Sequence, residues 1–379
     1  MPPRAGAPRQ EGPADGRRRP AQRHSHLQDL EGQARLLTPN ALADALKARA
    51  RDEGADLAGI APAAAADDAP AYDAWVSAGM HGSMAYMARN VESRRDVRAW
   101  FAPARSVLVC AYSYGGETPK PGPGLGRVAR YAVREDYHPI LKAKMAGLLD
   151  WLKTLVPEAQ GLPFCDTSPL LERSYARRAG LGWQGKNAMM ISPALGSYTI
   201  LAGLALDLEL PSDEPEADHC GSCRRCLDAC PTDAFPRAGV LDASRCIAYF
   251  TIENKGSVPE EFRPGVGDWV FGCDVCQEVC PWNRFEKPSR ALPPPREALA
   301  IPLAELADLD EEGFRRRFRG LPVSRSKRRG LLRGVLLAMG NSGDNRFRPI
   351  LERFSHDTDP LLAEQARWSM SKLSQKVLE

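Results

Sequence analysis

The chain has 379 residues, of which 43% are hydrophobic, and its formal net charge is +3. This length exceeds the usual single domain, so two or three domains are expected, and the near-neutral charge argues against a polycationic coat for nucleic acids. No run approaches eighteen consecutive apolar residues, which argues against a membrane-spanning helix and predicts no membrane partner.

The N-terminal residues 1–34 are rich in proline, glycine, arginine and alanine and hold few large apolar side chains, which predicts a disordered extension. The arginines at 17–19 are not followed by an apolar segment, so export through a twin-arginine signal is not expected. Eight of the ten cysteines lie at short spacings between residues 220 and 280. This clustering favours metal ligation in a reducing cytoplasm over disulfide bonds.

Helical and strand patterns alternate between residues 35 and 215. Leu42, Leu46 and Ala50 recur at four-residue spacing, as in a helix with one apolar face. In chain order, the patterns predict a helix from residue 38, a strand at 106–114, a helix at 138–157 and a strand at 196–210. Together they predict a layered α/β or α+β domain.

Residues 216–290 form a cysteine-rich segment, which a proline-rich linker separates from the last part of the chain. Residues 291–379 show helical patterns only, with two successive helices broken at 340–344 and then a third. This succession is typical of a short stack of helical repeats.

The cysteines of "CGSCRRCLDACP", residues 220–231, follow the spacing of a bacterial two-cluster ferredoxin, in which the fourth cysteine binds the neighbouring [4Fe-4S] cluster. The second run, "CDVCQEVCP", is one cysteine short, and Cys246 is the unassigned cysteine between the two runs. The predicted ligand sets are Cys220, Cys223, Cys226 and Cys280 for one cluster, and Cys230, Cys246, Cys273 and Cys276 for the other. A pair of structural zinc sites is the alternative.

Gly180, Gly182 and Gly185 match G-x-G-x-x-G, but a helical stretch precedes them where a dinucleotide fingerprint requires a strand. We interpret this loop as one that lets the backbone approach a large flat or polyanionic ligand. Asp166, in a turn after an apolar segment, could cap the next helix or act in catalysis. Asp136 and His138 have the same two possible roles, and for Asp136 capping is favoured.

Several motifs, taken in this order and spacing, closely resemble epoxyqueuosine reductase: "DTSPLLERSYARRAGLGWQGKN", "GSYTILAG", "CGSCRRCLDACPTDAF", "RCIAYFTIE", "GCDVCQEVCPWNRF" and "LLRGVLLAMGNSG". The resemblance spans roughly residues 38–375 and implies a cytoplasmic enzyme that depends on cobalamin and two [4Fe-4S] clusters. Such an enzyme reduces epoxyqueuosine to queuosine at the wobble position of tRNA anticodons, the last step of queuosine biosynthesis.

The resemblance also implies the domain plan. It consists of a nitroreductase-like α/β layered cobalamin-binding domain at 35–215, a ferredoxin-like domain with both clusters at 216–290, and an all-α HEAT-like tRNA-binding end at 291–379. By the same resemblance, Asp166 is the general acid, and its carboxyl must be protonated, which burial against the corrin favours. Further candidates to contact cobalamin are Arg89, Tyr131, Lys186, Asn187 and Met190. No histidine stands out as an axial ligand of cobalt.

A basic run gives the tRNA a binding surface, because residues 315–333 hold nine Lys or Arg side chains and no Asp or Glu. A solvated helix face is the alternative interpretation. The residues chosen as tRNA contacts are Arg325, Lys327, Arg328, Arg329 and Arg333.

Three other functions remain open: a corrinoid reductive dehalogenase, a ferredoxin-type electron carrier without catalysis, and an RNA-binding protein with structural clusters. For the favoured function we expect a monomer and an external electron donor of low potential.

Overall fold

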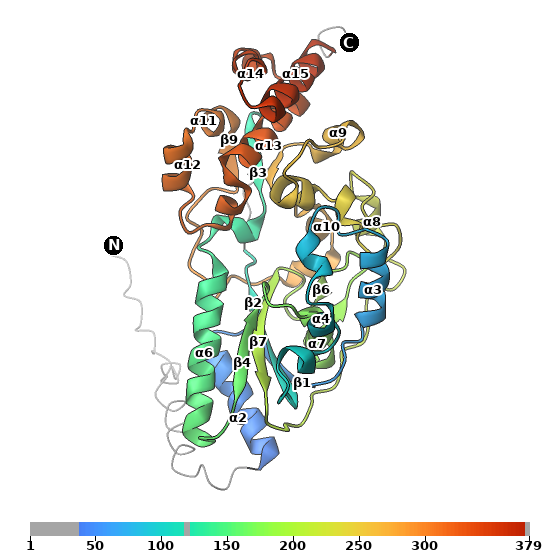
Figure 1. Ribbon diagram of the computed structural model, residues 1–379, viewed down its shortest axis with the longest axis vertical. Coiled ribbons are helices and arrows are strands. Elements are labelled where there is room, and N and C mark those ends of the chain that lie inside the picture. Colours follow the sequence, from blue (N-terminus) through green and yellow to red (C-terminus); the bar gives the residue numbers. More distant parts are fainter. Residues whose placement is uncertain (1–37, 117–121, 376–379) are drawn as a thin grey trace, which may run out of the picture.

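The computed structural model describes residues 38–116 and 122–375. The extension predicted at 1–34 lies outside the described residues. The molecule is elongated, with an α/β body at one end, a helical region at the other and the cysteine-rich segment between and beside them (Figure 1).

A four-stranded antiparallel sheet forms the centre of the body. Its order is β1 (Leu57–Pro62), β2 (Ser106–Ser113), β7 (Thr199–Leu206) and β4 (Gly161–Cys165). All eight residues of β2 are buried, because helices cover both faces of the sheet. This explains why β2 and β7 are continuous apolar runs rather than alternating ones.

Two hydrophobic cores lie on opposite faces of this sheet. On one face α2 (Pro39–Asp52) and α6 (Tyr137–Leu155) pack against Leu108 and Leu204, and on the other α7 (Glu172–Arg178) packs against Val107 and Val109. The smaller helices of the body are α3 (Ala69–Ser77), α4 (Val91–Arg95) and α5 (Val97–Trp100). The layered domain and its four predicted elements are confirmed.

A second, three-stranded sheet joins the three predicted domains. β3 (Leu125–Val128) pairs in parallel with β8 (Trp269–Phe271) and antiparallel with β9 (Ala300–Pro302). Val128, Phe271 and Ile301 share one core with the C-terminal helices. The body, the cysteine-rich segment and the helical region are therefore tied together by a common sheet and core.

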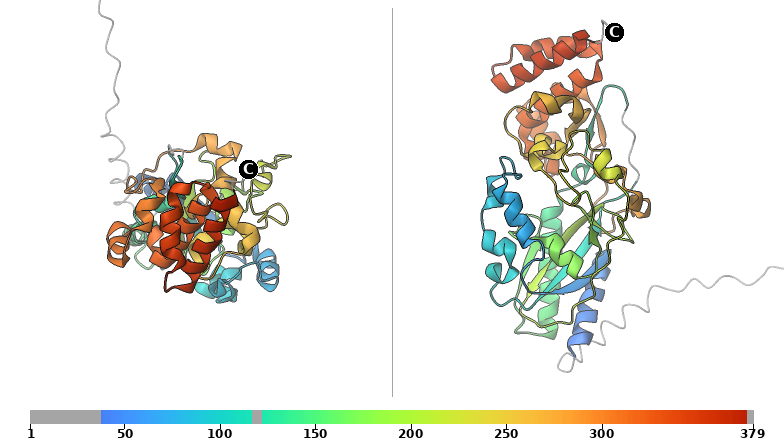
Figure 2. Two further views of the ribbon diagram at one scale, coloured as in Figure 1. Left: turned by 90° about the horizontal axis from the view of Figure 1, so that it is seen from above. Right: turned by 90° about the vertical axis from the view of Figure 1, so that its right-hand side faces the viewer.

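The cysteine-rich segment has short helices: α8 (Arg225–Asp228), α9 (Arg263–Val266), α10 (Val275–Glu278) and the π-helix η5 (Tyr249–Glu253). The C-terminal helices are α11 (Leu303–Ala307), α12 (Glu311–Arg317), α13 (Lys327–Ser342), α14 (Arg348–Ser355) and α15 (Pro360–Gln375), and they stack at one end of the molecule (Figure 2). Gly343, with φ of 69°, ends α13 inside the predicted break. None of the helices among the described residues is long and apolar enough to cross a membrane.

Candidate active site and cluster-binding region

A cavity of about 290 Å³ opens where all three parts of the chain meet. Residues from the body form most of its wall, η5 contributes two side chains, and Arg325 reaches in from the C-terminal region. The lining residues are Tyr114, Tyr131, Tyr137, Asp166, Glu172, Arg173, Met189, Met190, Ser197, Thr199, Ile200, Leu201, Ile252, Glu253 and Arg325.

Asp166 follows β4 directly, and its backbone is left-handed with φ of 46°, a strained conformation of the kind found at functional sites. Its Oδ2 accepts hydrogen bonds from Tyr137 Oη at 2.7 Å and from His138 Nε2 at 3.0 Å. Helix α7 has Leu171 as its N-cap and no side-chain cap. Asp166 therefore does not cap the following helix, and its carboxylate is held in the cavity wall.

His138 connects two carboxylates. Asp136 caps α6, as expected, by accepting from the backbone N of His138 at 3.0 Å, and the same oxygen lies 2.6 Å from the ring Nδ1. The ring stacks on Tyr137 with 4.2 Å between centroids. Both ring nitrogens of His138 are thus engaged, and its orientation is set from two sides.

The pair of Asp166 and His138 is charged in the free protein. Burial raises the pKa of Asp166, but the hydrogen bonds from His138 and Tyr137 outweigh it and bring the pKa to about 2. Burial lowers the pKa of His138, but its bonds to Asp136 and Asp166 bring it to about 9. At neutral pH the shared proton therefore resides on His138, next to the carboxylate that the sequence expected to be protonated.

Three tyrosines form an aromatic wall in the cavity. Tyr114 meets Tyr131 edge to face at 6.4 Å between centroids, and Tyr131 meets Tyr137 at 6.2 Å. Burial raises the pKa of all three phenols, so they stay neutral. This wall is suited to a large, flat ligand.

The eight clustered cysteines form two groups in space. Cys226 and Cys280 interact electrostatically with Cys220 and Cys223. In the other group, Cys246 interacts with Cys230, Cys273 with Cys246, and Cys276 with both Cys230 and Cys246. Cys276 also interacts with Cys226 of the first group, and the assignment of the eight cysteines to two clusters stays a prediction.

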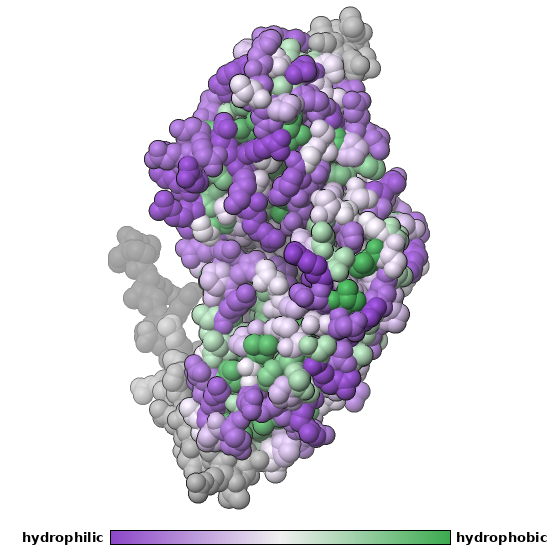
Figure 3. All heavy atoms as spheres, viewed as in Figure 1, coloured by the Kyte–Doolittle hydropathy of each residue, from purple (hydrophilic) through white to green (hydrophobic). Residues whose placement is uncertain are grey.

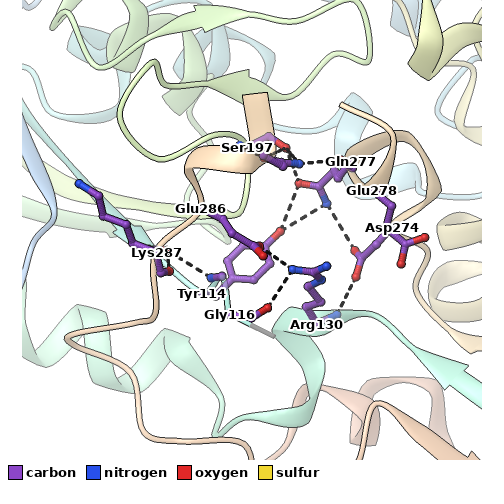
Figure 4. Close-up of polar contacts among 12 residues, drawn as sticks. Tyr114, Gly116, Arg130, Ser197, Asp274, Gln277, Glu278, Glu286 and Lys287 are labelled. Carbon is purple, nitrogen blue, oxygen red and sulfur yellow. Dashed lines mark hydrogen bonds and ion pairs between the residues drawn. The ribbon is translucent and has the colours of Figure 1, made fainter. Parts of the chain in front are cut away.

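Polar contacts connect the cavity wall to Gln277, the residue that follows Cys276 (Figure 4). The Gln277 side chain lies next to Cys276 in the chain; its Oε1 accepts from Ser197 Oγ at 3.0 Å, and its Nε2 donates to Tyr114 Oη at 3.4 Å. Gln277 Nε2 also lies 3.4 Å from Asp274 Oδ1. Tyr114 and Ser197 line the cavity, so these contacts hold the second group against it.

Two family models match the chain. Residues 94–167, which include Asp136, His138 and Asp166, match "Epoxyqueuosine reductase QueG, DUF1730", and residues 219–283 match a "4Fe-4S double cluster binding domain". Epoxyqueuosine reductase of Cyclobacterium marinum is 39% identical over 76% of this chain and 94% of its own. That of Xanthomonas campestris is 35% identical over 88% of this chain and 97% of its own. The chain belongs to the epoxyqueuosine reductase family.

Solved structures of the family agree with this fold. A selenomethionine-labelled epoxyqueuosine reductase superposes with a TM-score of 0.80 at 30% identity, over 87% of this chain and 90% of that one. An epoxyqueuosine reductase solved with a tRNA-Tyr epoxyqueuosine-modified stem loop gives 0.79 at 30% identity, over 87% and 89%. The Bacillus subtilis enzyme, described with its catalytic aspartate loop swung out of the active site, gives 0.79 at 29%, over 87% and 90%. Like them, this reductase has a mixed α/β fold, a double-cluster domain and a helical C-terminal region.

The residues expected to contact cobalamin lie in two places. Tyr131 and Met190 line the cavity with Asp166. Lys186 Nζ instead donates to the carbonyls of Gly221 at 2.6 Å and Cys223 at 2.8 Å, and Asn187 Nδ2 lies 3.4 Å from the carbonyl of Cys276. Arg89 is exposed and is not among the lining residues. In this reductase Lys186 and Asn187 therefore bind the cysteine loops.

The glycine loop corrects an expectation. A Cβ atom at Gly182, where φ is +156°, would lie 2.1 Å from the carbonyl oxygen of Ile191, and one at Gly180 2.5 Å from that of Glu214. The glycines thus permit close approach of the protein's own backbone, in the hairpin of β5 (Trp183–Gln184) and β6 (Met190–Ile191) and at the segment before the first cysteines.

The basic run has several different roles. Hydrophilic side chains cover the α11 and α12 region (Figure 3), but part of the run is used internally. Arg333 is only 2% exposed, and it donates to the carbonyls of Phe250, Asn254 and Gly256, which corrects its assignment as a tRNA contact. Arg328 bonds the carbonyl of Leu309 at 2.6 Å, and Arg329 pairs with Asp359. Lys327 is exposed.

Reasoning from the sequence missed several cavity residues. Tyr137 lies between Asp136 and His138, the two residues weighed for capping or catalysis, so the short run "DYH" is an available signal for it. No sequence signal marks the other three, because each comes from a different element and only the fold brings them together; they are Glu172, Glu253 and Tyr114.

Proposed function

We propose that this reductase converts epoxyqueuosine to queuosine at the wobble position of a tRNA anticodon, with two [4Fe-4S] clusters, cobalamin, and Asp166 as proton donor. The observation that carries the proposal is the cavity. In it Asp166, with its bonded His138, shares the lining with Tyr114, and Tyr114 bonds Gln277, the residue after Cys276, so the proton donor lies near the expected electron source.

The reaction needs two electrons and two protons. Both C–O bonds of the epoxide break, a carbon–carbon double bond forms, and the oxygen leaves as water. The clusters would supply single electrons, and cobalamin, when bound, would supply a low-potential reducing centre for the epoxide. The chain's own residues must bring protons to the departing oxygen.

Both implied cofactors are compatible with the residues present. Two groups of four thiols provide the donor set of two cubane clusters. For the corrin, the cavity offers an aromatic wall together with Met190 and Leu201 as apolar contacts, and the Thr199 hydroxyl could meet its amide side chains. His138 is occupied by two carboxylates, and the described lining residues of the cavity include no histidine.

Asp166 and His138 form a proton relay. In the free protein the proton sits on His138, because its imidazolium is stabilised by two carboxylates. A ligand that fills the cavity excludes water and penalises the separated charges, which moves the proton towards a neutral Asp166. Asp166 is the only aspartate among the described lining residues, and the B. subtilis relative is described with a catalytic aspartate loop, which supports Asp166 in this role.

The helical region is proposed as the tRNA-binding part, with HEAT-like stacking of α13, α14 and α15. A relative of similar fold was solved with an epoxyqueuosine-modified stem loop, and the outer face of the region carries exposed Lys and Arg side chains. Among the five proposed contacts, Arg325, Lys327 and Arg329 are exposed, and Arg325 also lines the cavity.

The test is anaerobic conversion. Enzyme reconstituted with clusters and cobalamin is mixed with epoxyqueuosine tRNA and a low-potential reductant, and the nucleosides are analysed by mass spectrometry. We expect queuosine from the wild type and from the exposed control Asp150→Asn, and none above background from Asp166→Asn. Cobalamin binding without queuosine would point to another corrinoid substrate, and absence of cobalamin binding would refute the mechanism.

A further inference from the structure

Arg325 differs from the rest of the basic run because it is placed in the catalytic cavity. It belongs to η8 (Pro322–Ser326), which precedes α13, and its side chain is 40% exposed. Its Nη2 donates to Glu253 Oε1 at 3.2 Å. An arginine from the helical region thus pairs with a carboxylate from the cysteine-rich segment, inside a cavity built mainly by the body.

Glu253 occupies an unusual backbone position. It is the last residue of η5, the π-helix that begins three residues after Cys246, and the side chain is 23% exposed. Single π-helical turns are rare and are frequently found at functional sites. With Asp166 and Glu172, Glu253 gives the cavity three carboxylates, while Arg325 and Arg173 provide its cations.

The pair is open to exchange. The distance of 3.2 Å and the partial exposure of both side chains describe a weak, single hydrogen bond rather than a buried two-pronged one. By contrast, Arg317 bonds both Glu297 and Glu305 at 2.6 Å, and Arg333 is buried. A phosphate offers a guanidinium two oxygens at once, so it can displace Glu253 from Arg325.

We propose that Arg325 is a positioning residue that exchanges Glu253 for a backbone phosphate of the nucleotide whose base enters the cavity, freeing the Glu253 carboxylate to accept hydrogen bonds from that base. This inference rests on the proposed function, because it takes the substrate to be a nucleotide in an RNA loop. A guanine-type base presents N–H donors, and the side chain of epoxyqueuosine adds a secondary amine, so a carboxylate is the complementary group.

The exchange also favours the proton transfer. The Arg325 charge helps to lower the pKa of Asp166. A phosphate on Arg325 neutralises that charge and leaves Glu253 uncompensated, and both changes favour a proton on Asp166. Entry of the substrate would therefore prepare the acid that the reaction requires.

The experiment measures RNA binding and a single turnover separately. Binding of a fluorescent epoxyqueuosine anticodon stem loop is measured over a range of salt concentrations for three holoenzyme variants, Arg325→Gln, Arg325→Lys and Glu253→Gln. Queuosine formation is then followed at saturating RNA. Arg105 and Glu209 form an exposed ion pair at the opposite end of β2 from Tyr114, so Arg105→Gln and Glu209→Gln are matched controls.

We expect Arg325→Gln to reduce the slope of log K against log salt by about 0.7, the loss of one phosphate contact on a single strand, and to slow the turnover roughly 10-fold or more. Arg325→Lys keeps the slope but not the full rate, because it cannot make a two-pronged contact. Glu253→Gln keeps the slope and slows the turnover. The controls match the wild type.

An unchanged salt slope in Arg325→Gln overturns the inference. Equal losses of thermal stability in Arg325→Gln and Glu253→Gln, without any change in RNA binding or turnover, also overturn it. That result would mean that the ion pair only connects two domains. If Arg325→Gln does not fold, a weaker slope in Arg325→Lys, or wild-type turnover in Glu253→Gln, overturns it. A wild type that makes no queuosine refutes the proposed function, and the salt slope still decides the phosphate contact.

Discussion

The two cysteine groups differ in their surroundings. In the first, Cys280 lies in the wall of an open depression of about 790 Å³, and Cys220 and Cys223 belong to a loop on which exposed side chains predominate. In the second, Gln277, which follows Cys276, bonds Tyr114 of the cavity wall at 3.4 Å, and η5, which begins three residues after Cys246, lines the cavity with Ile252 and Glu253. We infer a direction from this difference: an external donor reaches the first group, and the second delivers into the cavity.

The strongest way to break this comparison is to remove one ligand of the second group. We expect Cys246→Ser to lose that cluster, to bring the iron content to about half, and to abolish queuosine formation. Iron analysis and electron paramagnetic resonance of the reduced protein would measure the loss.

Cys110→Ser is the control, because Cys110 is buried in β2 away from both groups. Full iron content in Cys246→Ser would show that Cys246 is not a ligand.

The variant His138→Gln tests proton delivery in the cavity that the second group faces. Loss of the relay should slow the turnover about 10²-fold, the usual lower range for general acid–base catalysis. Because the pKa of His138 is about 9 in the folded protein and its unfolded value is near 6.5, its stabilising effect is complete below about pH 6.5 and is lost as the pH rises through 9.

Urea unfolding at pH 6 and pH 10 checks the direction of this pH dependence of stability. The wild type should lose more stability than His138→Gln over this interval, and an equal loss would contradict the charged pair. The Asp166 contribution has the opposite direction, since its pKa of about 2 means that it is lost only as the pH falls through that value.

The first cysteine group, where we infer that electrons enter, depends on Lys186, which bonds the loop of Cys220 and Cys223. Lys186→Met removes hydrogen bonds to the carbonyls of Gly221 and Cys223, at 2.6 and 2.8 Å, so the first cluster should be lost to a chelator roughly 10-fold faster and the second at the wild-type rate. Lys144→Met is matched, because Lys144 bonds the carbonyl of Glu53 at 2.6 Å in the body. Equal lability of both clusters would show that Lys186 does not act on the first loop alone.

The smallest expected effect concerns the potential of the first cluster. Trp183 Nε1 donates to Cys220 Sγ at 3.4 Å, and such a bond stabilises the more negative, reduced cluster. Trp183→Phe should therefore lower the potential of this cluster alone in a redox titration. Trp75→Phe, which removes a bond to the carbonyl of Leu241, should leave both potentials unchanged, and a shift in the second cluster would contradict the assignment.

Local patterns predicted the elements well. The helix with Leu42 and Leu46 and the apolar strand at β2 appear where expected, because helical spacing and burial on both faces are written in a short stretch of residues. Local patterns could not predict that β3, β8 and β9 form one sheet, because the three strands belong to three different predicted domains.

Side-chain roles were less predictable than elements. Arg325 and Arg333 stand eight positions apart in one basic run, and sequence reasoning treated them alike. Arg325 on η8 faces the cavity, whereas Arg333 on α13 is buried against backbone carbonyls of the η5 region. The two side chains differ because η8 and α13 contact this region from different directions.

The sequence by itself determined the layered body and the aspartate after β4, because spacing along the chain controls which residues share one face of a helix or strand and which residues follow directly after a strand. Only the tertiary structure decided that Asp166 shares a proton with His138, that the glycine loop serves the protein's own packing, and that Glu253 and Arg325 meet in the cavity. These contacts join residues far apart in the chain, and burial and hydrogen bonding between such residues depend on the packing of whole elements.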